Sequence, residues 1–257
     1  MTSRAASSGQ LAGARALITG ASRGLGRSLA LGLAQNGASV ALGARDMSAL
    51  DAVGEEVAAL GVHASTHPLD VTSQDSVDEF VQQAARALGG LDIVINNAGV
   101  LVSGALLDSS GEDWTRALET NVLGTVRVTR SAGRILIAQE SGSVVNMASN
   151  FGLKGVPRHT AYCASKAAIL SFTRCLALEW ARSNVRVNAI APGFFATDLN
   201  ADIRQDARAM EKVRRSIPLD TIGEPEDLMP WVLPLCGPGS RFVTGTTVVV
   251  DGGETAR

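Results

Sequence analysis

The chain has 257 residues, of which 46% are hydrophobic and 4% aromatic, and this composition is sufficient for one large α/β domain with an aliphatic core. Its 23 basic and 25 acidic residues give a net charge of −2, which argues against a surface for nucleic acid or for an anionic membrane. No apolar run approaches the ~20 residues that span a bilayer, and Cys163, Cys175 and Cys236 lack the spacing of metal ligands, so we expect reduced thiols, no metal and a cytoplasmic location.

The first segment, residues 1–10, is polar and lacks the apolar core of a signal peptide. We expect it to be flexible. Residues 11–257 contain no internal repeat, low-complexity tract or linker, and we expect them to form a single domain.

Short apolar runs alternate with helical patterns along this domain. Runs rich in aliphatic and β-branched residues predict buried strands at 16–18, 40–42, 62–69, 91–95, 144–146, 185–190 and 247–250. Helices are predicted at 24–36, 47–60, 73–88, 112–138 and 158–182. This alternation predicts an α/β fold, with a doubly wound, Rossmann-type parallel sheet of about seven strands flanked by helices.

Local start signals support some of these helices. Thr72-Ser73-Gln74-Asp75 and Ser110-Gly111-Glu112-Asp113 both resemble capping boxes, with aspartate in place of glutamate. A last helix begins at Glu224-Pro225, but Pro230 and Pro234 interrupt it, and an interior proline kinks or breaks a helix. Its shape therefore stays open.

A glycine-rich loop follows the first predicted strand and opens the first helix. Gly20, Gly24 and Gly26 have the spacing G-x-x-x-G-x-G. Such glycines permit a tight turn and a close approach of the backbone to a pyrophosphate, at a helix N-terminus that favours anions. A glycine triplet by itself also fits a simple strand–helix turn, so the strand before it and the helix after it are what favour a dinucleotide site.

The one tyrosine of the chain, Tyr162, precedes Lys166 by four residues in a predicted helix. The two side chains then share one face, where the ammonium would stabilise a tyrosinate and lower the tyrosine pKa from its usual value near 10. A phenol tuned in this way can donate or accept a proton. The spacing by itself also fits an ordinary surface pair.

Two further motifs decide between these interpretations. Ser149 lies 13 residues before Tyr162, and Asn96-Asn97-Ala98-Gly99 ends the fourth predicted strand. With the glycine loop, they resemble the short-chain dehydrogenase/reductase family over nearly the whole chain. The resemblance implies an enzyme that interconverts a ketone and a secondary alcohol by hydride transfer. It also implies a catalytic set of Asn121, Ser149, Tyr162 and Lys166.

Each member of this set has an implied role. Ser149 would hydrogen-bond the substrate carbonyl, and Tyr162 would exchange the proton. Lys166 would hold the ribose hydroxyls of the cofactor, and Asn121 would position a water that leads protons toward the lysine.

The end of the second strand indicates which nicotinamide cofactor is bound. An acidic residue there would hold the ribose 2′-hydroxyl of NAD, but this chain has Ala44 followed by Arg45. Arg23 lies inside the glycine loop, and two guanidiniums favour a 2′-phosphate, so we expect NADP(H), although Asp46 weakens the argument slightly. The resemblance implies the remaining cofactor contacts: Gly20, Ser22, Gly24, Leu25, Gly26, Asp70, Val71, Asn97, Ala98, Gly99, Tyr162, Lys166, Pro192, Gly193 and Thr197.

Two segments are expected to shape the substrate site, residues 150–159 and a lid at about 194–218. Expected substrate contacts are Ser149, Phe151, His159 and Tyr162. Four basic side chains in these segments would attract an anionic substrate or else lie as solvated surface charges: Lys154, Arg158, Arg204 and Arg208.

Within the family, residues 177–181 and 187–193 resemble gluconate 5-dehydrogenases, which implies a ketosugar acid as the substrate. The overall pattern is also similar to 3-oxoacyl-[acyl-carrier-protein] reductases of fatty-acid synthesis, although residues 138–140 lack the basic cluster expected for an acidic carrier protein. A catalytically silent NADP(H)-binding sensor is a third alternative, which the intact catalytic set argues against.

Apolar residues on the two long helices at 112–138 and 158–182 extend beyond the stripe needed to cover a sheet. This surplus predicts burial against another subunit, and the family resemblance implies a homotetramer. One thick internal core without a partner is the alternative.

Overall fold

Seven parallel strands form one sheet in the computed structural model, which describes residues 9–256. The strands lie in the order β3-β2-β1-β4-β5-β6-β7, and each neighbouring pair is parallel. Their bounds are β1 (Arg15–Thr19), β2 (Ser39–Ala44), β3 (Ala64–Pro68), β4 (Ile93–Asn96), β5 (Gly142–Met147), β6 (Val185–Pro192) and β7 (Thr247–Val250). The predicted doubly wound sheet is confirmed, whereas the flexible segment predicted at 1–10 lies, up to residue 8, outside the described residues.

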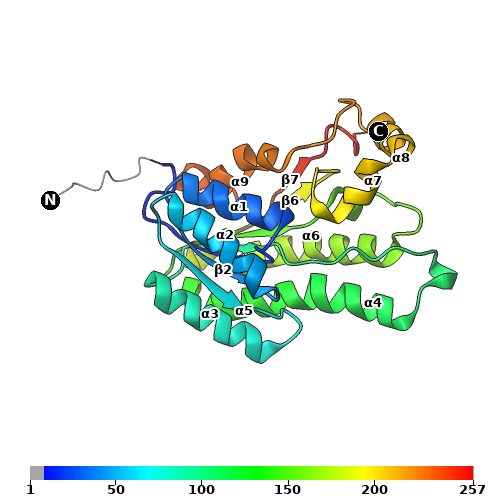
Figure 1. The fold of residues 1–257 in the computed structure, drawn as a ribbon. Coiled ribbons are helices and arrows are strands. Elements are labelled where there is room, and N and C mark those ends of the chain that lie inside the picture. Colours follow the sequence, from blue (N-terminus) through cyan, green and yellow to red (C-terminus); the bar gives the residue numbers. More distant parts are fainter. Residues whose placement is uncertain (1–8, 257) are drawn as a thin grey trace.

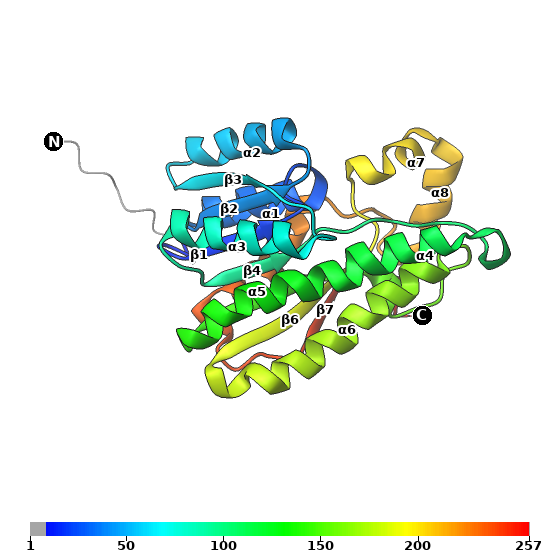
Figure 2. The same cartoon turned by 90° about the horizontal axis from the view of Figure 1, so that it is seen from below.

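Helices cover both faces of this sheet, as the two ribbon views show (Figures 1 and 2). One face carries α1 (Gly24–Gln35), α2 (Met47–Ala59) and α9 (Met229–Cys236). The other carries α3 (Gln74–Leu88), α4 (Gly111–Leu118), α5 (Gly124–Ala138) and α6 (Thr160–Trp180). Two short helices, α7 (Ala201–Gln205) and α8 (Ala207–Ser216), stand beyond the sheet near the chain's C-terminal end.

Alternate side chains of each strand enter different cores. Ile18 and Leu42 pack toward α1 and α2, whereas Leu17 and Val94 pack toward α3 and α5. Because both faces of the central strands are buried, their sequences are almost continuously apolar, which is why they could be recognised, whereas the edge strand β3 is more polar and only partly buried.

The predicted helix at 112–138 is interrupted. A π-helical turn, η2 (Glu119–Leu123), separates α4 from α5 and contains Asn121. A single π-turn inside an α-helix is frequent at functional sites. The start of α4 is as predicted, with Ser110 and Asp113 forming a capping box. At α3, however, the cap is Ser73, while Thr72 donates hydrogen bonds to Asp70 instead.

The prolines near the end shorten the last helix without abolishing it. Residues Pro225–Leu228 form a 3-10 turn, η6, and α9 follows directly. Pro230 lies in the first turn of α9, where its missing N–H costs nothing, and only Pro234 lies inside the helix. Among residues 9–256, no helix combines the length and apolar character that a membrane span requires.

Candidate active site

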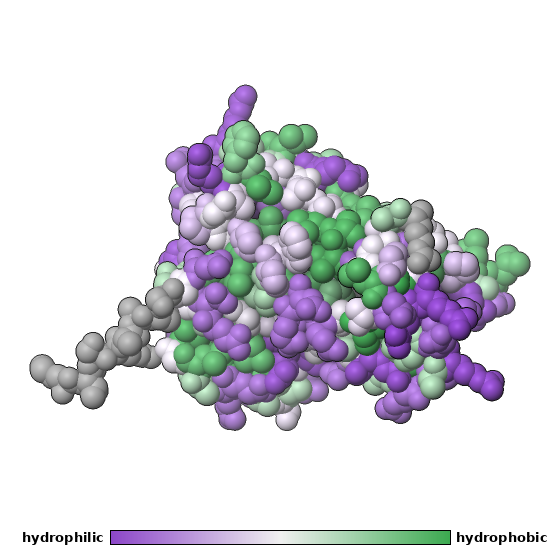
Figure 3. Space-filling view, turned by 90° about the horizontal axis from the view of Figure 1, so that it is seen from above, coloured by the Kyte–Doolittle hydropathy of each residue, from purple (hydrophilic) through white to green (hydrophobic). Residues whose placement is uncertain are grey.

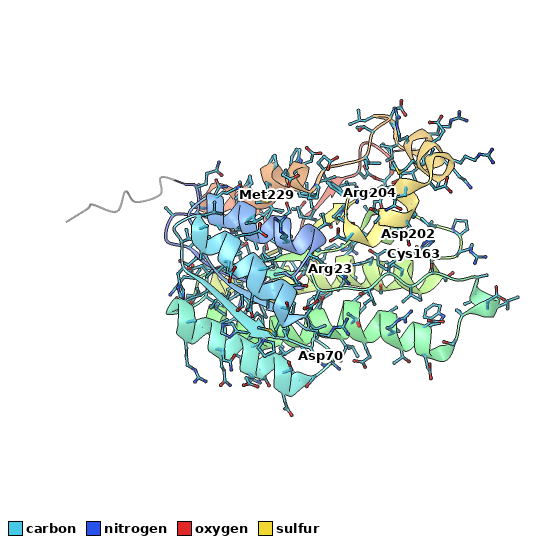
Figure 4. All side chains as sticks on the ribbon, in the orientation of Figure 1. Arg23, Asp70, Cys163, Asp202, Arg204 and Met229 are labelled. Atoms are coloured by element: carbon cyan, nitrogen blue, oxygen red, sulfur yellow. The ribbon has the colours of Figure 1, made fainter. Side chains whose placement is uncertain are left out.

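A cleft of about 660 Å³ opens at the carboxyl ends of the strands. The strand order reverses between β1 and β4, because β2 and β3 are added on one side of β1 and β4 to β7 on the other, and ligands of doubly wound sheets bind at such a switch point. The loops after β1, β2, β3, β4, β5 and β6 all contribute to the lining. Arg23, before α1, and Asp70, after β3, both line the cleft and are labelled in Figure 4.

The glycine loop places backbone atoms that carry no side chain at the surface of the cleft. Gly20 and Gly24 have φ angles of +66° and +55°, which side chains other than glycine rarely adopt. A Cβ atom on Gly26 would lie 2.1 Å from the carbonyl oxygen of Gly20, so only glycine fits there. Arg23 caps α1 without a side-chain hydrogen bond, which leaves first-turn N–H groups open to an anionic ligand.

The loop after β4 is tied to this turn by hydrogen bonds. The Asn97 amide Nδ2 donates to the carbonyl oxygens of Thr19 and Gly20 at 3.1 and 3.0 Å. The Thr19 hydroxyl accepts from the backbone N–H groups of Asn97 and Ala98, both at 3.0 Å. Asn97 therefore fixes the cleft floor by bonds within the protein.

Charged groups at the far end of the cleft fit a phosphorylated ribose. Arg23 and Arg45 are both exposed and both line the cleft. Asp46 accepts a hydrogen bond from the Ala49 N–H at 3.1 Å and so caps α2, which explains its presence without a role toward ribose. Hydrogen bonds from the Thr72 backbone and hydroxyl, followed by the charge of Arg45, lower the pKa of Asp70.

The predicted proton-transfer residues meet at the other end. Ser149 follows β5, and its hydroxyl accepts the Phe151 N–H at 3.2 Å and is hydrogen-bonded to Tyr162. Lys166 is buried, lies one turn from Tyr162 on α6, and donates from Nζ to the Met147 carbonyl oxygen at 2.7 Å. Its Nζ is 5.7 Å from the centroid of the tyrosine ring.

Burial dominates the electrostatics of this pair. It raises the pKa of Tyr162 to about 12, and the hydrogen bond to Ser149 opposes this increase only partly. Burial also lowers the pKa of Lys166 to about 8. The lowered tyrosine pKa that the spacing predicts is therefore not found in the protein alone: desolvation is the largest influence on the phenol, and Lys166 Nζ donates to a carbonyl oxygen.

Asn121 stands behind the cleft and does not line it. Its Oδ1 accepts the Val100 N–H at 2.7 Å, while its Nδ2 donates to the Val100 carbonyl and to the Ser165 hydroxyl, both at 3.0 Å. The side chain thus holds the loop after β4 against α6. A Cβ on Gly99 would lie 3.2 Å from Asn121 Oδ1 and 3.6 Å from Lys166 Nζ. The absence of a side chain at Gly99 therefore lets both groups lie close to the loop after β4.

The predicted cofactor contacts come together. The residues that line the cleft include Gly20, Ser22, Arg23, Gly24, Leu25, Gly26, Arg45, Asp70, Val71, Asn97, Ala98, Gly99, Tyr162, Lys166, Pro192, Gly193 and Thr197. Of the predicted substrate contacts, Ser149 and Tyr162 line it as well.

The other two predicted substrate contacts lie beside the tyrosine. Phe151 packs edge-on against the Tyr162 ring, with centroids 6.1 Å apart, and against the His159 ring at 5.3 Å. Neither Phe151 nor His159 lines the cleft. Sequence reasoning did not name Thr72 or Leu101 as lining residues, and it included Phe195, Asp198 and Asn200 only as members of the segment 194–218. No sequence spacing shows which side chains of these loops face the cleft.

Comparisons with known proteins agree with this geometry. Residues 20–255 match the family model described as enoyl-(acyl carrier protein) reductase. The chain is 36% identical over 244 residues to a 3-oxoacyl-[acyl-carrier-protein] reductase of Thermotoga maritima, covering 95% of this chain and 98% of that protein. It is 37% identical over 245 residues to a gluconate 5-dehydrogenase of Gluconobacter oxydans, covering 95% and 96%.

Solved structures give the same result. A gluconate 5-dehydrogenase from Burkholderia cenocepacia in complex with NADP and tartrate superposes with a TM-score of 0.92 at 31% identity, covering 96% of this chain and 97% of that one. A short-chain type dehydrogenase/reductase from Mycobacterium marinum gives a TM-score of 0.91 at 37% identity, with the same coverage of 96% and 97%. This chain therefore belongs to the short-chain dehydrogenase/reductase family, and it is an oxidoreductase that acts on CH–OH groups.

Proposed function

We propose that this protein interconverts a ketone and a secondary alcohol with NADP(H), using Tyr162 as the general acid and base. One observation carries the proposal: Ser149, Tyr162 and Lys166 line one end of a cleft whose other end carries Arg23 and Arg45. Reaction groups and cofactor-phosphate groups thus face a single cleft.

The cofactor is NADP(H). Arg23 in the glycine loop and Arg45 after β2 suit a 2′-phosphate, while the neighbouring Asp46 caps α2 through Oδ1, and the gluconate 5-dehydrogenase relative was solved with NADP. When bound, the cofactor supplies the hydride. The open N–H groups at the start of α1 would hold its pyrophosphate.

The family resemblance suggests the other contacts, all of which line the cleft. Asp70 and Val71 would face the adenine, and the loop at 97–99 would face the adenosine ribose. Lys166 would hold the nicotinamide ribose, while Pro192, Gly193 and Thr197 would contact the carboxamide and so select the face of the ring that is offered.

The ionisation states suit reduction of a ketone. With a pKa of about 12, Tyr162 keeps its proton at neutral pH and is ready to donate it. The Ser149 hydroxyl, next to the phenol, would orient the carbonyl oxygen. Asn121 acts through position in this scheme, since its amide is committed to Val100 and Ser165. Its backbone carbonyl oxygen already accepts from the Thr125 hydroxyl at 2.9 Å, so only its second lone pair would be left for a proton-carrying water.

The substrate we propose is a ketosugar acid, as the similarity to gluconate 5-dehydrogenases suggests. A 3-oxoacyl thioester on a carrier protein is the second candidate, since a 3-oxoacyl-[acyl-carrier-protein] reductase matches at nearly the same identity. Phe151 and His159 are proposed to border the substrate beside Tyr162.

Residues 194–218 are proposed to act as a lid. Neither α7 nor α8 buries a described residue, and segments with few buried contacts open at low cost. Phe195, Thr197 and Asn200 nevertheless line the cleft, so movement of this segment would change access to it. In the view from above, the surface over α8 is mostly hydrophilic, whereas apolar residues gather nearer the middle (Figure 3).

The proposal is tested by NADPH oxidation against ketosugar acids, 3-oxoacyl thioesters and hydrophobic ketones. We expect Tyr162→Phe to reduce turnover by about 10²–10⁴-fold, because it removes the proton donor. NADPH affinity should stay nearly unchanged, since the ring and its packing on Phe151 remain. Substantial turnover by this variant would refute the role of Tyr162. If the wild type bound NADPH but no ketone in the panel caused NADPH oxidation, the alternative of a catalytically silent NADP(H)-binding sensor would be favoured.

A further inference from the structure

The C-terminal segment places a carboxylate against the loop that carries the proposed catalytic serine. Glu254 is only 13% exposed. Its Oε1 forms an ion pair with Lys154 Nζ at 2.6 Å, and its Oε2 accepts from Asn150 Nδ2 at 2.7 Å. The Ser216 hydroxyl, at the end of α8, lies 3.3 Å from Oε1 but donates at 2.6 Å to the Val213 carbonyl oxygen. Glu254 therefore holds the loop after β5 and lies beside the end of the lid.

Asn150 and Lys154, the two loop residues that bind Glu254, lie on either side of Phe151, whose ring packs against Tyr162. Asn150 directly follows Ser149 and begins the 3-10 turn η3 (Asn150–Gly152), and its carbonyl oxygen accepts the Lys154 N–H at 3.2 Å. Phe151 lies between them, with its ring against Tyr162 and with Lys154 Nζ 5.7 Å from its centroid. Holding Asn150 and Lys154 thus fixes both ends of this turn.

The segment that presents Glu254 is itself held in place. The Asp251 carboxylate accepts the N–H groups of Gly253 and Thr255 at 3.0 and 2.9 Å, which closes a tight turn. The Gly252 carbonyl accepts the Leu219 N–H at 3.2 Å, directly after the lid. A Cβ on Gly193 would lie 2.6 Å from Asp251 Cβ, so the strand end proposed to contact the nicotinamide packs against the same turn.

We propose that Glu254 is a positioning residue that fixes the Ser149–Lys154 loop, and with it the serine hydroxyl and Phe151. The idea rests on the proposed function, because it assigns the loop to the reacting end of the cleft. A buried carboxylate with a lysine and an amide partner resists displacement, since losing one partner leaves the other charge unpaired.

The ion pair also bears on substrate binding. Lys154 was one of the side chains that would attract an anionic substrate, but Glu254 neutralises it. We therefore assign Lys154 to the loop and not to the substrate.

The test is a double-mutant cycle with Glu254→Gln and Lys154→Met, and with Glu55→Gln as a control on the exposed face of α2. Each of the first two variants should lower kcat about 10-fold, because small displacements of a reacting group are costly. The double variant should be no worse than the poorer single one, since both remove the same link. NADPH affinity should stay within about twofold in all variants, because the cofactor contacts are untouched.

Hydrogen exchange provides a readout that does not depend on turnover. Amides of residues 149–155 should exchange faster in Glu254→Gln and Lys154→Met than in the wild type and the control. Unchanged exchange there, or an unchanged kcat in Glu254→Gln, would overturn the proposal.

The Michaelis constant separates the two assignments of Lys154. If the lysine bound an anionic substrate, Glu254→Gln would free it and lower the KM for a ketosugar acid, whereas Lys154→Met would raise that KM; such opposite shifts would refute the positioning role. If the wild type reduced no ketone at all, the proposed function would fail, while the exchange data would still decide whether Glu254 holds the loop.

Discussion

Tyr162 and Lys166 share one face of α6, but burial moves their pKa values in opposite directions, to about 12 and about 8. Both shifts favour the neutral form of the side chain, since a neutral group loses less hydration free energy than a charged one when it is buried. At neutral pH the phenol remains protonated and the amine remains mostly charged. The resting protein is therefore set to donate a proton, and generating the tyrosinate needs added positive charge near the ring.

The buried lysine should give folding a pH dependence. Between pH 8 and its ordinary pKa of 10.5, Lys166 binds more protons in the unfolded chain than in the folded one. Its effect is to make the free energy of unfolding rise with pH in this window, by up to about 1.4 kcal/mol per pH unit. Above pH 10 Tyr162 acts in the opposite sense, because the folded state keeps its proton up to about 12. Urea unfolding of wild type and Lys166→Met between pH 8 and pH 10 measures the difference. Equal slopes in the two proteins would contradict the assignment.

Arg45 should determine cofactor preference. Arg45→Ala removes a guanidinium that would bind only the 2′-phosphate, so we expect NADPH affinity to fall about 10-fold or more and NADH affinity to change little. Fluorescence titration with both cofactors measures this. Arg182→Ala, an exposed arginine in the turn after α6, serves as the control. Equal losses for both cofactors would contradict the role of Arg45.

At the scale of elements, the first turn of α1 should tolerate no side chain at Gly26. Gly26→Ala would push a methyl group against the Gly20 carbonyl, which is backbone and cannot turn aside. We expect a loss of about 1–3 kcal/mol in the free energy of unfolding and weaker NADPH binding. Gly111→Ala is the matched control, because its Cβ would have no neighbour within 4 Å and it begins α4. If both variants unfolded like the wild type, the close approach at Gly26 would be unimportant.

The strands and most helices could be predicted because each carries its signal in consecutive residues. The strands β1, β5 and β6 are apolar runs, and α1 and α2 end within one residue of the predicted bounds. The π-turn at Asn121 could not be predicted, since it depends on how that amide meets Val100 and Ser165 from other elements. The short helices α7 and α8 were missed because they have no buried stripe.

The same limit applies to the candidate site. The glycine loop and the Tyr162–Lys166 pair are local spacings, and their members do line one cleft. The contact of Glu254 with Asn150 joins positions that are 104 residues apart, and no spacing within a single element signals it. The pKa of Tyr162 was misjudged for a related reason: the spacing shows the lysine but not how deeply the ring is enclosed.

At the scale of the whole molecule, part of the predicted apolar surplus is internal. Leu136, Ile169 and Leu170 are buried, whereas Leu123 and Leu178 remain 41% and 81% exposed. Phe242, in the loop before β7, is 95% exposed. Large apolar side chains exposed to this extent are typical of surfaces that associate.

We predict a homotetramer, built by two-fold pairing of such surfaces. Light scattering behind size-exclusion chromatography at micromolar concentration measures the mass directly. A monomer mass would refute association, and a dimer would leave only the tetramer prediction wrong. Glu55→Gln, on α2 and thus on the opposite face of the sheet from Leu178 of α6, should leave the mass unchanged and controls for handling.

Because Tyr162 is the one tyrosine in the sequence, it is also a spectroscopic label that is already in place. Protein grown with tyrosine labelled only at the ring carbon that bears the hydroxyl, Cζ, would give one labelled resonance per protomer, and that resonance belongs to the proposed proton donor. Its chemical shift reports the ionisation of the phenol directly, with no mutation and no substrate. Recording it with and without NADP+ would show how far the cofactor's charge moves the proton on which the reaction depends.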